Sequence, residues 1–225
     1  MSENNAIMQG GSVTESCVLQ ISDLHKSYGS HPVLEGVSFS IPRGKIVGLL
    51  GPNGCGKSTI MKMISGLLPA DNGSILIDGH LPGLVSKSIV SYLPERTYLN
   101  DWMKVSEVLQ FFSDFYADFD LERAQQMLAD LHLSPNTRLK TMSKGTKEKV
   151  QLILVMSRRA QLYLLDEPIG GVDPAAREYI LNTILKNFDE SSSILITTHL
   201  IQDVEAIFDQ VLFLNPVSYT HLTLP

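Results

Sequence analysis

One short stretch of the chain has the residue types and the spacing that bind phosphate groups. The pattern G-x-x-x-x-G-K-[S/T] is met by Gly51, Pro52, Asn53, Gly54, Cys55, Gly56, Lys57, Ser58 and Thr59. Its glycines let the backbone wrap closely around a ligand, so that successive N–H groups point at phosphate oxygens. We expect Lys57 to neutralise the β- and γ-phosphates of a nucleotide, and Ser58 to hold the Mg2+ that bridges them.

The residues on either side of this loop predict the two elements that must position it. Lys45 to Leu50 is a strand-like run, and Lys57 to about Ser65 has the pattern of a helix. Such a helix presents the positive end of its dipole to the same phosphates. A glycine-rich turn without a ligand is the alternative, but the agreement between the motif and its flanks favours phosphate binding.

The rest of the apolar pattern predicts an α/β protein. Continuous apolar runs are typical of buried parallel strands, and alternating runs are typical of half-buried ones. Two of the runs end in polar residues, the first at Asp166-Glu167-Pro168 and the second at His199. Strands are predicted at 18–21, 33–41, 45–50, 74–77, 89–93, 161–165, 193–198 and finally 211–214, and helices at 57–65, within 105–133, at 147–159, 174–188 and 200–208.

Length and composition limit the class of protein. The 225 residues allow one large α/β domain with a small inserted subdomain, and 44% hydrophobic and 19% charged residues fit a globular chain. The net charge of −6 disfavours a broad nucleic-acid surface, so no nucleic-acid partner is expected. The two cysteines suggest no disulfide framework, and Cys55 is expected to be a reduced thiol. No apolar run approaches the roughly 18–20 residues that span a bilayer.

Taken in chain order, the motifs resemble the ATP-binding cassette of ABC transporters. The resemblance covers about residues 18–214 and is closest to bacterial exporter-like systems. It implies a P-loop NTPase core with a mainly parallel sheet, an N-terminal antiparallel β region and an inserted α-helical subdomain at about 95–142, preceded by a flexible leader at 1–17. The elements that carry it are Tyr28, the phosphate loop, Glu95, Ser143-Lys144-Gly145-Thr146, the run from Leu162 to Glu167, Asp173 and His199.

The resemblance assigns roles to several of these residues. Tyr28 matches the aromatic residue that stacks on adenine, and Asp166 matches the carboxylate that holds Mg2+ at the end of a buried strand. Glu167 matches the general base for the attacking water, and His199 matches the histidine that contacts the γ-phosphate. Lys57 completes the expected catalytic set. Each role has an alternative. Tyr28 could be an ordinary tyrosine at a strand end, Asp166 and Glu167 could belong to a simple turn after the strand, and His199 could be structural.

Other positions depart from the pattern of the family. Ser143 and Gly145 are kept from the signature Leu-Ser-Gly-Gly-Gln, whereas its first, third and fifth positions differ. In the family this segment binds the γ-phosphate of ATP held by the other subunit, although Ser143 could also be a simple helix cap. Glu95 replaces the usual glutamine; it could still coordinate Mg2+, or be a solvated side chain. Asp173 matches the aspartate that connects the two sites of a dimer, and it also looks like an N-cap.

The resemblance implies an ATPase that works with a membrane protein. Two copies, or one copy and a paralogue, would sandwich two ATP molecules and drive a separate integral-membrane permease from the cytoplasmic face of the membrane. The permease is expected to dock around Glu95 to Lys104 and the helical insert, with Trp102 as a candidate contact. The alternatives are a weakly active nucleotide-binding subunit that pairs with an active paralogue, and a soluble ABC ATPase of DNA repair or translation.

The last residues do not look native. Val217 to Leu222 resembles the translation of a transposon-derived sequencing adapter. We therefore expect residues 215–225 to carry no function and to replace the natural C-terminus of a truncated reading frame.

Overall fold

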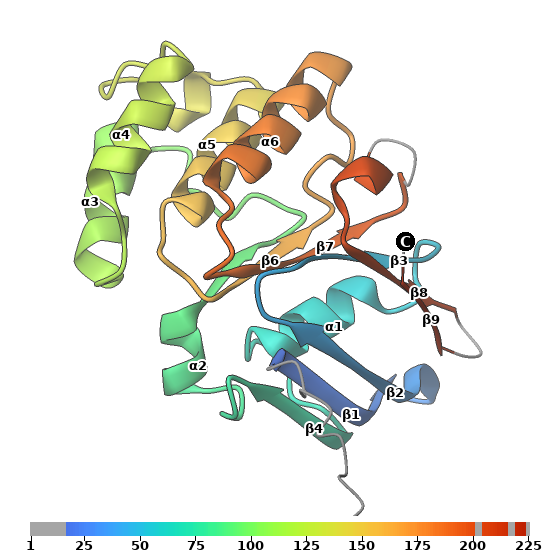
Figure 1. The fold of residues 1–225 in the computed structure, drawn as a ribbon. Helices are drawn as coiled ribbons and strands as arrows, with labels where there is room; N and C mark the ends of the chain where they lie inside the picture. The colour runs from blue at the N-terminus through green and yellow to red at the C-terminus, as the bar shows by residue number, and fades with distance from the viewer. Residues whose placement is uncertain (1–16, 201–203, 216–218, 224–225) are drawn as a thin grey trace, which may run out of the picture.

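Two β-sheets and several helices make up the computed structural model, which describes residues 17–200, 204–215 and 219–223 (Figure 1). The larger sheet has six strands in the order β5-β6-β7-β3-β8-β9. Its first five strands run parallel, and β9 pairs antiparallel with β8. The strands span β3 Ile46–Leu50, β5 Val90–Leu93, β6 Leu162–Asp166, β7 Ser193–Thr198, β8 Gln210–Leu214 and β9 Tyr219–Thr223.

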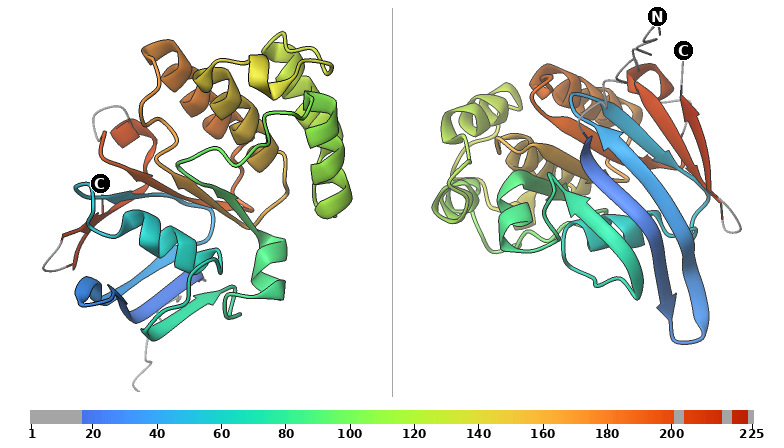
Figure 2. Two further views of the ribbon diagram at one scale, coloured as in Figure 1. Left: turned by 180° about the vertical axis from the view of Figure 1, so that it is seen from behind. Right: turned by 60° about the horizontal axis from the view of Figure 1, so that its bottom comes forward.

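The smaller sheet is antiparallel and comes mostly from the start of the chain. Its strand order is β2-β1-β4. The helix α1 (Lys57–Ile64) lies between this sheet and the larger one (Figures 1 and 2). Because α1 has a sheet on each side, its apolar residues from Ile60 to Ile64 are fully buried. The strands span β1 Cys17–Tyr28, β2 His31–Pro42 and β4 Asn72–Ile77.

The opposite face of the larger sheet is covered by helices. The helices α5 (Lys144–Met156) and α6 (Pro174–Asn187) pack on it, and α3 (Val105–Phe115) and α4 (Leu121–Asp130) lie beyond them at the edge of the molecule (Figure 2). The central strands β3, β6 and β7 are buried along their whole length. Two hydrophobic clusters, one on each face of the sheet, therefore form the core.

The expected fold class is confirmed: a mainly parallel sheet, an antiparallel β region and inserted helices are all present. A short helix α2 (Leu84–Ile89) was not expected, and Val211 to Leu214 is not the last strand, because β9 follows it. Of the helix expected from 200 to 208, Val204 is helical and is followed by a 3-10 turn at Glu205–Ile207, while residues 201–203 lie outside the described residues.

The expectations for the two ends of the chain are tested only in part. Residues 1–16, 201–203, 216–218 and 224–225 lie outside the described residues, so the leader and part of the tail have no structural account. Cys17, the last residue assigned to the leader, begins β1. Tyr219 to Thr223 forms the backbone of β9, but the non-native origin of the tail and the domain boundaries stay predictions.

Candidate functional site

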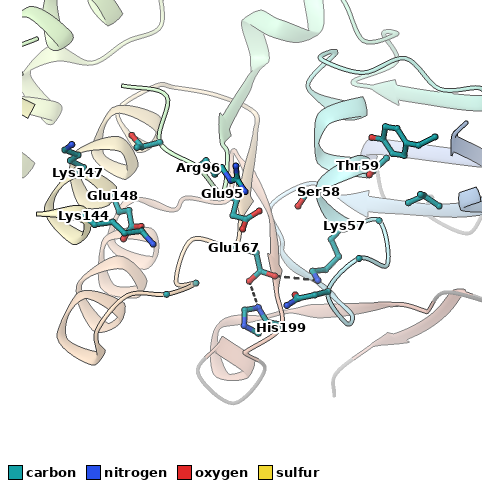
Figure 3. Close-up of a pocket in the computed structure, with 18 residues that line it drawn as sticks. Lys57, Ser58, Thr59, Glu95, Arg96, Lys144, Lys147, Glu148, Glu167 and His199 are labelled. Atoms are coloured by element: carbon teal, nitrogen blue, oxygen red, sulfur yellow. Dashed lines mark hydrogen bonds and ion pairs between the residues drawn. The ribbon is translucent and has the colours of Figure 1, made fainter. Parts of the chain in front are cut away.

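The predicted site residues gather where several parallel strands end. A pocket of about 890 Å3 lies there, between the phosphate loop and the start of α5 (Figure 3). This is the carboxyl edge of the sheet, where ligands of open α/β folds bind. The predicted residues that line the pocket are Tyr28, Asn53, Gly54, Gly56, Lys57, Ser58, Thr59, Glu95, Glu167 and His199.

The phosphate loop takes a conformation that depends on glycine. Gly54 and Gly56 have φ angles of 84° and 106°, in the range that side chains of other residues rarely adopt. A Cβ atom at Gly56 would lie 2.6 Å from Cδ2 of Leu34, so the loop also packs tightly against β2. Gly56 is the N-cap of α1, and the first turn of that helix directs N–H groups without intrahelical partners toward the pocket. The loop therefore fits an anion.

Lys57 is almost completely buried beneath this loop. Its Nζ donates hydrogen bonds to the carbonyl oxygens of Gly51 (2.8 Å) and Pro52 (3.1 Å). It also lies 3.6 Å from Oε1 of Glu167. The lysine thus holds these two loop residues, and Cys55 of the same loop is buried. A buried ammonium group beside a carboxylate is a suitable cation for phosphate oxygens.

Glu167 lies between the lysine and the histidine. Its Oε1 faces Lys57, and its Oε2 is 2.9 Å from Nδ1 of His199 (Figure 3). Its backbone is left-handed, with φ of 49°, a conformation that costs a residue other than glycine roughly 1–2 kcal/mol. Strained backbone at a strand end is typical of functional positions. Lys57 begins α1, Glu167 follows β6 and His199 follows β7, and the fold brings the three side chains together.

Asp166 lies behind the pocket and is buried. Its Oδ1 accepts hydrogen bonds from Ser58 Oγ (3.1 Å) and Thr197 Oγ1 (2.6 Å), and Tyr92 OH is 3.5 Å from its Oδ2. Burial raises the pKa of this carboxyl group, the two hydroxyl donors oppose the rise, and the negative charges of Glu95 and Glu167 add to it.

The donor set around Asp166 fits Mg2+. A serine hydroxyl and a carboxylate oxygen lie side by side, and Mg2+ prefers a few protein oxygens together with phosphate and water. Within the described ranges, no group of three acidic, histidine or cysteine side chains could hold a metal ion. Glu95 is exposed at the rim of the pocket, close enough for its charge to act on Asp166. Ser58 and Asp166 are thus the better placed of the three predicted ligands.

Ser143 and Gly145 are placed differently from the other predicted residues. Neither is among the described residues that line the pocket. Ser143 is the N-cap of α5 and accepts a hydrogen bond from Thr146 N (3.2 Å), so its capping role is present. Asp173 likewise caps α6 through Ala176 N (2.9 Å). Contacts of these residues with a second subunit stay predictions.

Sequence reasoning missed several residues of the site. Lys147 and Glu148 from α5 line the pocket opposite the phosphate loop, beside Lys144 of the predicted signature segment (Figure 3). Thr197 and Tyr92 contact Asp166, although no role was assigned to either of them. The available signal for Thr197 was a pair of threonines that continues the apolar run Ile194–Ile196 within one strand, because a buried hydroxyl needs a partner.

Comparisons with known proteins agree with this geometry. A family model described as ABC transporter matches residues 34–170. The chain belongs to the ABC transporter family. It is 34% identical over 204 residues to the SkfA peptide export ATP-binding protein SkfE of Bacillus subtilis, with 88% of this chain and 85% of that protein covered.

A second relative and a solved structure are also similar to this chain. The linearmycin resistance ATP-binding protein LnrL of Bacillus subtilis is 32% identical over 202 residues, which are 86% of this chain but 65% of that relative, so the chain spans less than two thirds of its length. A solved structure described as the ATP binding subunit of an ABC transporter superposes with a TM-score of 0.83 at 30% identity, covering 92% of this chain and 90% of that one. The resemblance to ABC cassettes is thereby confirmed.

In the described part of the chain, no helix combines the length and the apolar character that crossing a bilayer requires.

Proposed function

We propose that this ABC-family protein binds ATP with Mg2+, hydrolyses the ATP, and uses this turnover to drive a separate integral-membrane permease. The observation that carries the proposal is the arrangement of Lys57, Glu167 and His199, in which one carboxylate contacts a cation on one side and an imidazole on the other. Tyr28, half exposed at the pocket rim, is the proposed adenine-stacking residue.

Each side chain has a definite task in this proposal. Lys57 exchanges its hydrogen bonds to the loop carbonyls for phosphate oxygens, so its charge is delivered by a short side-chain movement. Glu167 polarises the attacking water and accepts its proton, and His199 holds the second carboxylate oxygen in place. Ser58 and Asp166 would hold Mg2+, which supplies positive charge to the phosphate oxygens.

A dimer is the proposed working state. The start of α5 carries Ser143 and Gly145, which do not line the pocket of their own subunit. A serine hydroxyl at a helix N-terminus, followed by glycine, suits a phosphate group presented by a second subunit. Each ATP would then lie between the phosphate loop of one copy and the α5 N-terminus of the other. The second copy is either this chain or a paralogue.

The permease would dock on the exposed aromatic side chains beside α3. Tyr98, Trp102, Phe111 and Phe115 are between 47% and 69% exposed, and the rings of Phe111 and Phe115 stack with centroids 6.0 Å apart. Exposed aromatic clusters mark interaction surfaces. Asp101, the neighbour of Trp102 in the chain, forms an ion pair with Lys147 of α5 (2.5 Å), next to the proposed ATP site. Such docking would place the protein at the cytoplasmic face of the membrane.

One alternative has a specific observation in its favour. Glu95 adds a carboxylate near Asp166 where the family usually has a neutral amide, and the signature segment departs from the family at several positions. Both features fit a subunit that binds nucleotide but hydrolyses it poorly beside an active paralogue. The presence of both Glu167 and His199 at the pocket opposes this alternative.

The test compares phosphate release by the wild type, Glu167→Gln and Glu122→Gln. Glu122 is exposed on α4, away from the pocket, and controls for the loss of one negative charge. We expect Glu167→Gln to lower kcat at least about 100-fold and Glu122→Gln to leave it unchanged. Equal, near-zero rates for wild type and Glu167→Gln would support the binding-only alternative. Light scattering of Glu167→Gln with ATP and Mg2+ then tests the dimer, which should replace the monomer.

A further inference from the structure

Thr197 occupies a special place on the strand next to the proposed catalytic carboxylates. It lies directly beside Asp166 in the parallel pairing of β7 with β6, and its side chain is completely buried. Its Oγ1 is 2.6 Å from Oδ1 of Asp166 and 3.0 Å from the backbone N of Glu167. Among the described residues, Thr197 is the one whose side-chain hydrogen bonds reach both carboxylate-bearing residues.

The direction of these two hydrogen bonds follows from chemistry. A backbone N–H only donates, so the hydroxyl oxygen of Thr197 accepts from Glu167. The single hydroxyl proton is then left for Asp166, whose ionised carboxylate only accepts. The hydroxyl proton therefore points to Asp166 while the hydroxyl oxygen accepts from Glu167, and this gives the group one orientation. It fixes the side chain of one acidic residue and the backbone of the next.

The backbone of Glu167 needs such an anchor. Its φ of 49° is left-handed, and its N–H is shared between Oγ1 (3.0 Å) and the carbonyl oxygen (3.1 Å) of Thr197. This backbone directs the carboxylate of Glu167 toward Lys57 and His199. Loss of the Thr197 hydroxyl would remove one of the two acceptors of the Glu167 N–H. It would also remove one of the two hydroxyl donors to Oδ1 of Asp166 and leave Ser58 as the other.

We propose that Thr197 is a positioning residue that orients both carboxylates of the site, the metal-binding one through its side chain and the catalytic one through its backbone. This inference deepens the proposed ATPase function and rests on it. It requires that Thr197 affect turnover and Mg2+ dependence more than nucleotide affinity. A merely structural hydroxyl would affect stability alone.

Ser193 provides a matched control at the other end of the same strand. Its hydroxyl is also buried and has the same pattern, accepting from Gly44 N (3.0 Å) and donating to Pro42 O (3.1 Å). It lies away from the pocket, so Ser193→Ala removes an equivalent buried hydroxyl without touching the site. A difference between the two positions thus reports on the site and not on the strand.

The experiment measures kcat and KM, and the Mg2+ dependence of fluorescent ATP-analogue binding, for Thr197→Val, Thr197→Ser and Ser193→Ala. We expect Thr197→Val to lower kcat roughly 10-fold to 100-fold and to raise the Mg2+ midpoint, with the Mg2+-free affinity within about threefold of wild type. Thr197→Ser should restore both values, and Ser193→Ala should lower the melting temperature only. Thr197→Ala replaces the valine variant if circular dichroism shows that the latter does not fold.

The outcomes separate this inference from the proposed function. If the wild type releases no phosphate but Thr197→Val still shifts the Mg2+ midpoint and serine restores it, the orientation of Asp166 stands and the proposed hydrolysis fails. If Thr197→Val keeps both the wild-type kcat and the wild-type Mg2+ midpoint, or if Ser193→Ala loses as much kcat, Thr197 is not a positioning residue.

Discussion

Two glycines of the phosphate loop differ in their surroundings, and this difference gives a measurable prediction. Both have positive φ angles, 84° at Gly54 and 106° at Gly56. A Cβ atom at Gly54 would have nothing within 4 Å, whereas one at Gly56 would lie 2.6 Å from Cδ2 of Leu34 and 3.2 Å from Cγ1 of Val33. An alanine at Gly54 therefore measures backbone strain alone, whereas an alanine at Gly56 measures backbone strain together with steric conflict.

The expected costs follow from these distances. Gly54→Ala adds only left-handed strain, roughly 1–2 kcal/mol of unfolding free energy. Gly56→Ala adds left-handed strain and an overpacking cost of about 1–3 kcal/mol, because Leu34 is only 2% exposed and can shift only against its core neighbours. The two variants should thus differ by about 1–3 kcal/mol, or by roughly 2–12 °C in Tm for a domain of this size.

Urea and thermal unfolding followed by circular dichroism measure this difference, and binding of a fluorescent ATP analogue adds a second readout. Gly56→Ala should also weaken nucleotide binding more than Gly54→Ala, because Val33 lines the pocket and would be displaced. Equal unfolding free energies for the two variants, or a less stable Gly54→Ala, would refute the steric reasoning.

Two further predictions concern Tyr28, which lines the pocket, and Asp71, which bonds the two residues of β1 just before Tyr28. Tyr28→Ala should weaken binding of the ATP analogue by about 5-fold to 150-fold, the equivalent of about 1–3 kcal/mol of stacking, and Tyr28→Trp should keep the affinity of the wild type. Equal Kd values for the wild type and both variants would argue against stacking. Asp71→Asn should lower Tm at neutral pH, because the carboxylate bonds Lys26 Nζ (2.6 Å) and Ser27 N (2.7 Å). These bonds, that of Lys26 first, hold the pKa of Asp71 below its ordinary 3.8, so its stabilisation is present above pH 3.8 and is lost as pH falls through the lowered pKa. The Tm difference between wild type and Asp71→Asn should disappear on that acidic side, and a difference that grows there would contradict this account.

Elements with strong local signals were predictable from the sequence. The N-cap Asp173 and the apolar run Leu162–Leu165 of β6 depend on neighbours a few residues away, and both are present as expected. Ser143 is the N-cap of α5, which is the alternative that the sequence left open. The helix α2 escaped detection because Leu84 and Val85 are exposed, so no amphipathic pattern marks it.

On the inserted helices, the helical period of apolar residues does not by itself predict which of them are buried. Phe112 and Phe115 are three residues apart and share one face of α3, but Phe115 is 69% exposed, whereas Phe112 is 5% exposed. Periodicity predicts which residues share a face, but burial also requires a second element to cover that face. The neighbouring helices cover the stripe that ends at Phe112 and leave the last turn of α3 open.

The sequence by itself determined which side chains are available for chemistry: a phosphate loop, a carboxylate pair at a strand end and a histidine at another, each recognisable from adjacent residues. Only the tertiary structure decided which atoms meet. Glu167 lies between Lys57 and His199, and Thr197 bridges Asp166 and Glu167, because β3, β6 and β7 pair in one parallel register. That register depends on packing between segments distant in the chain, which local patterns do not encode.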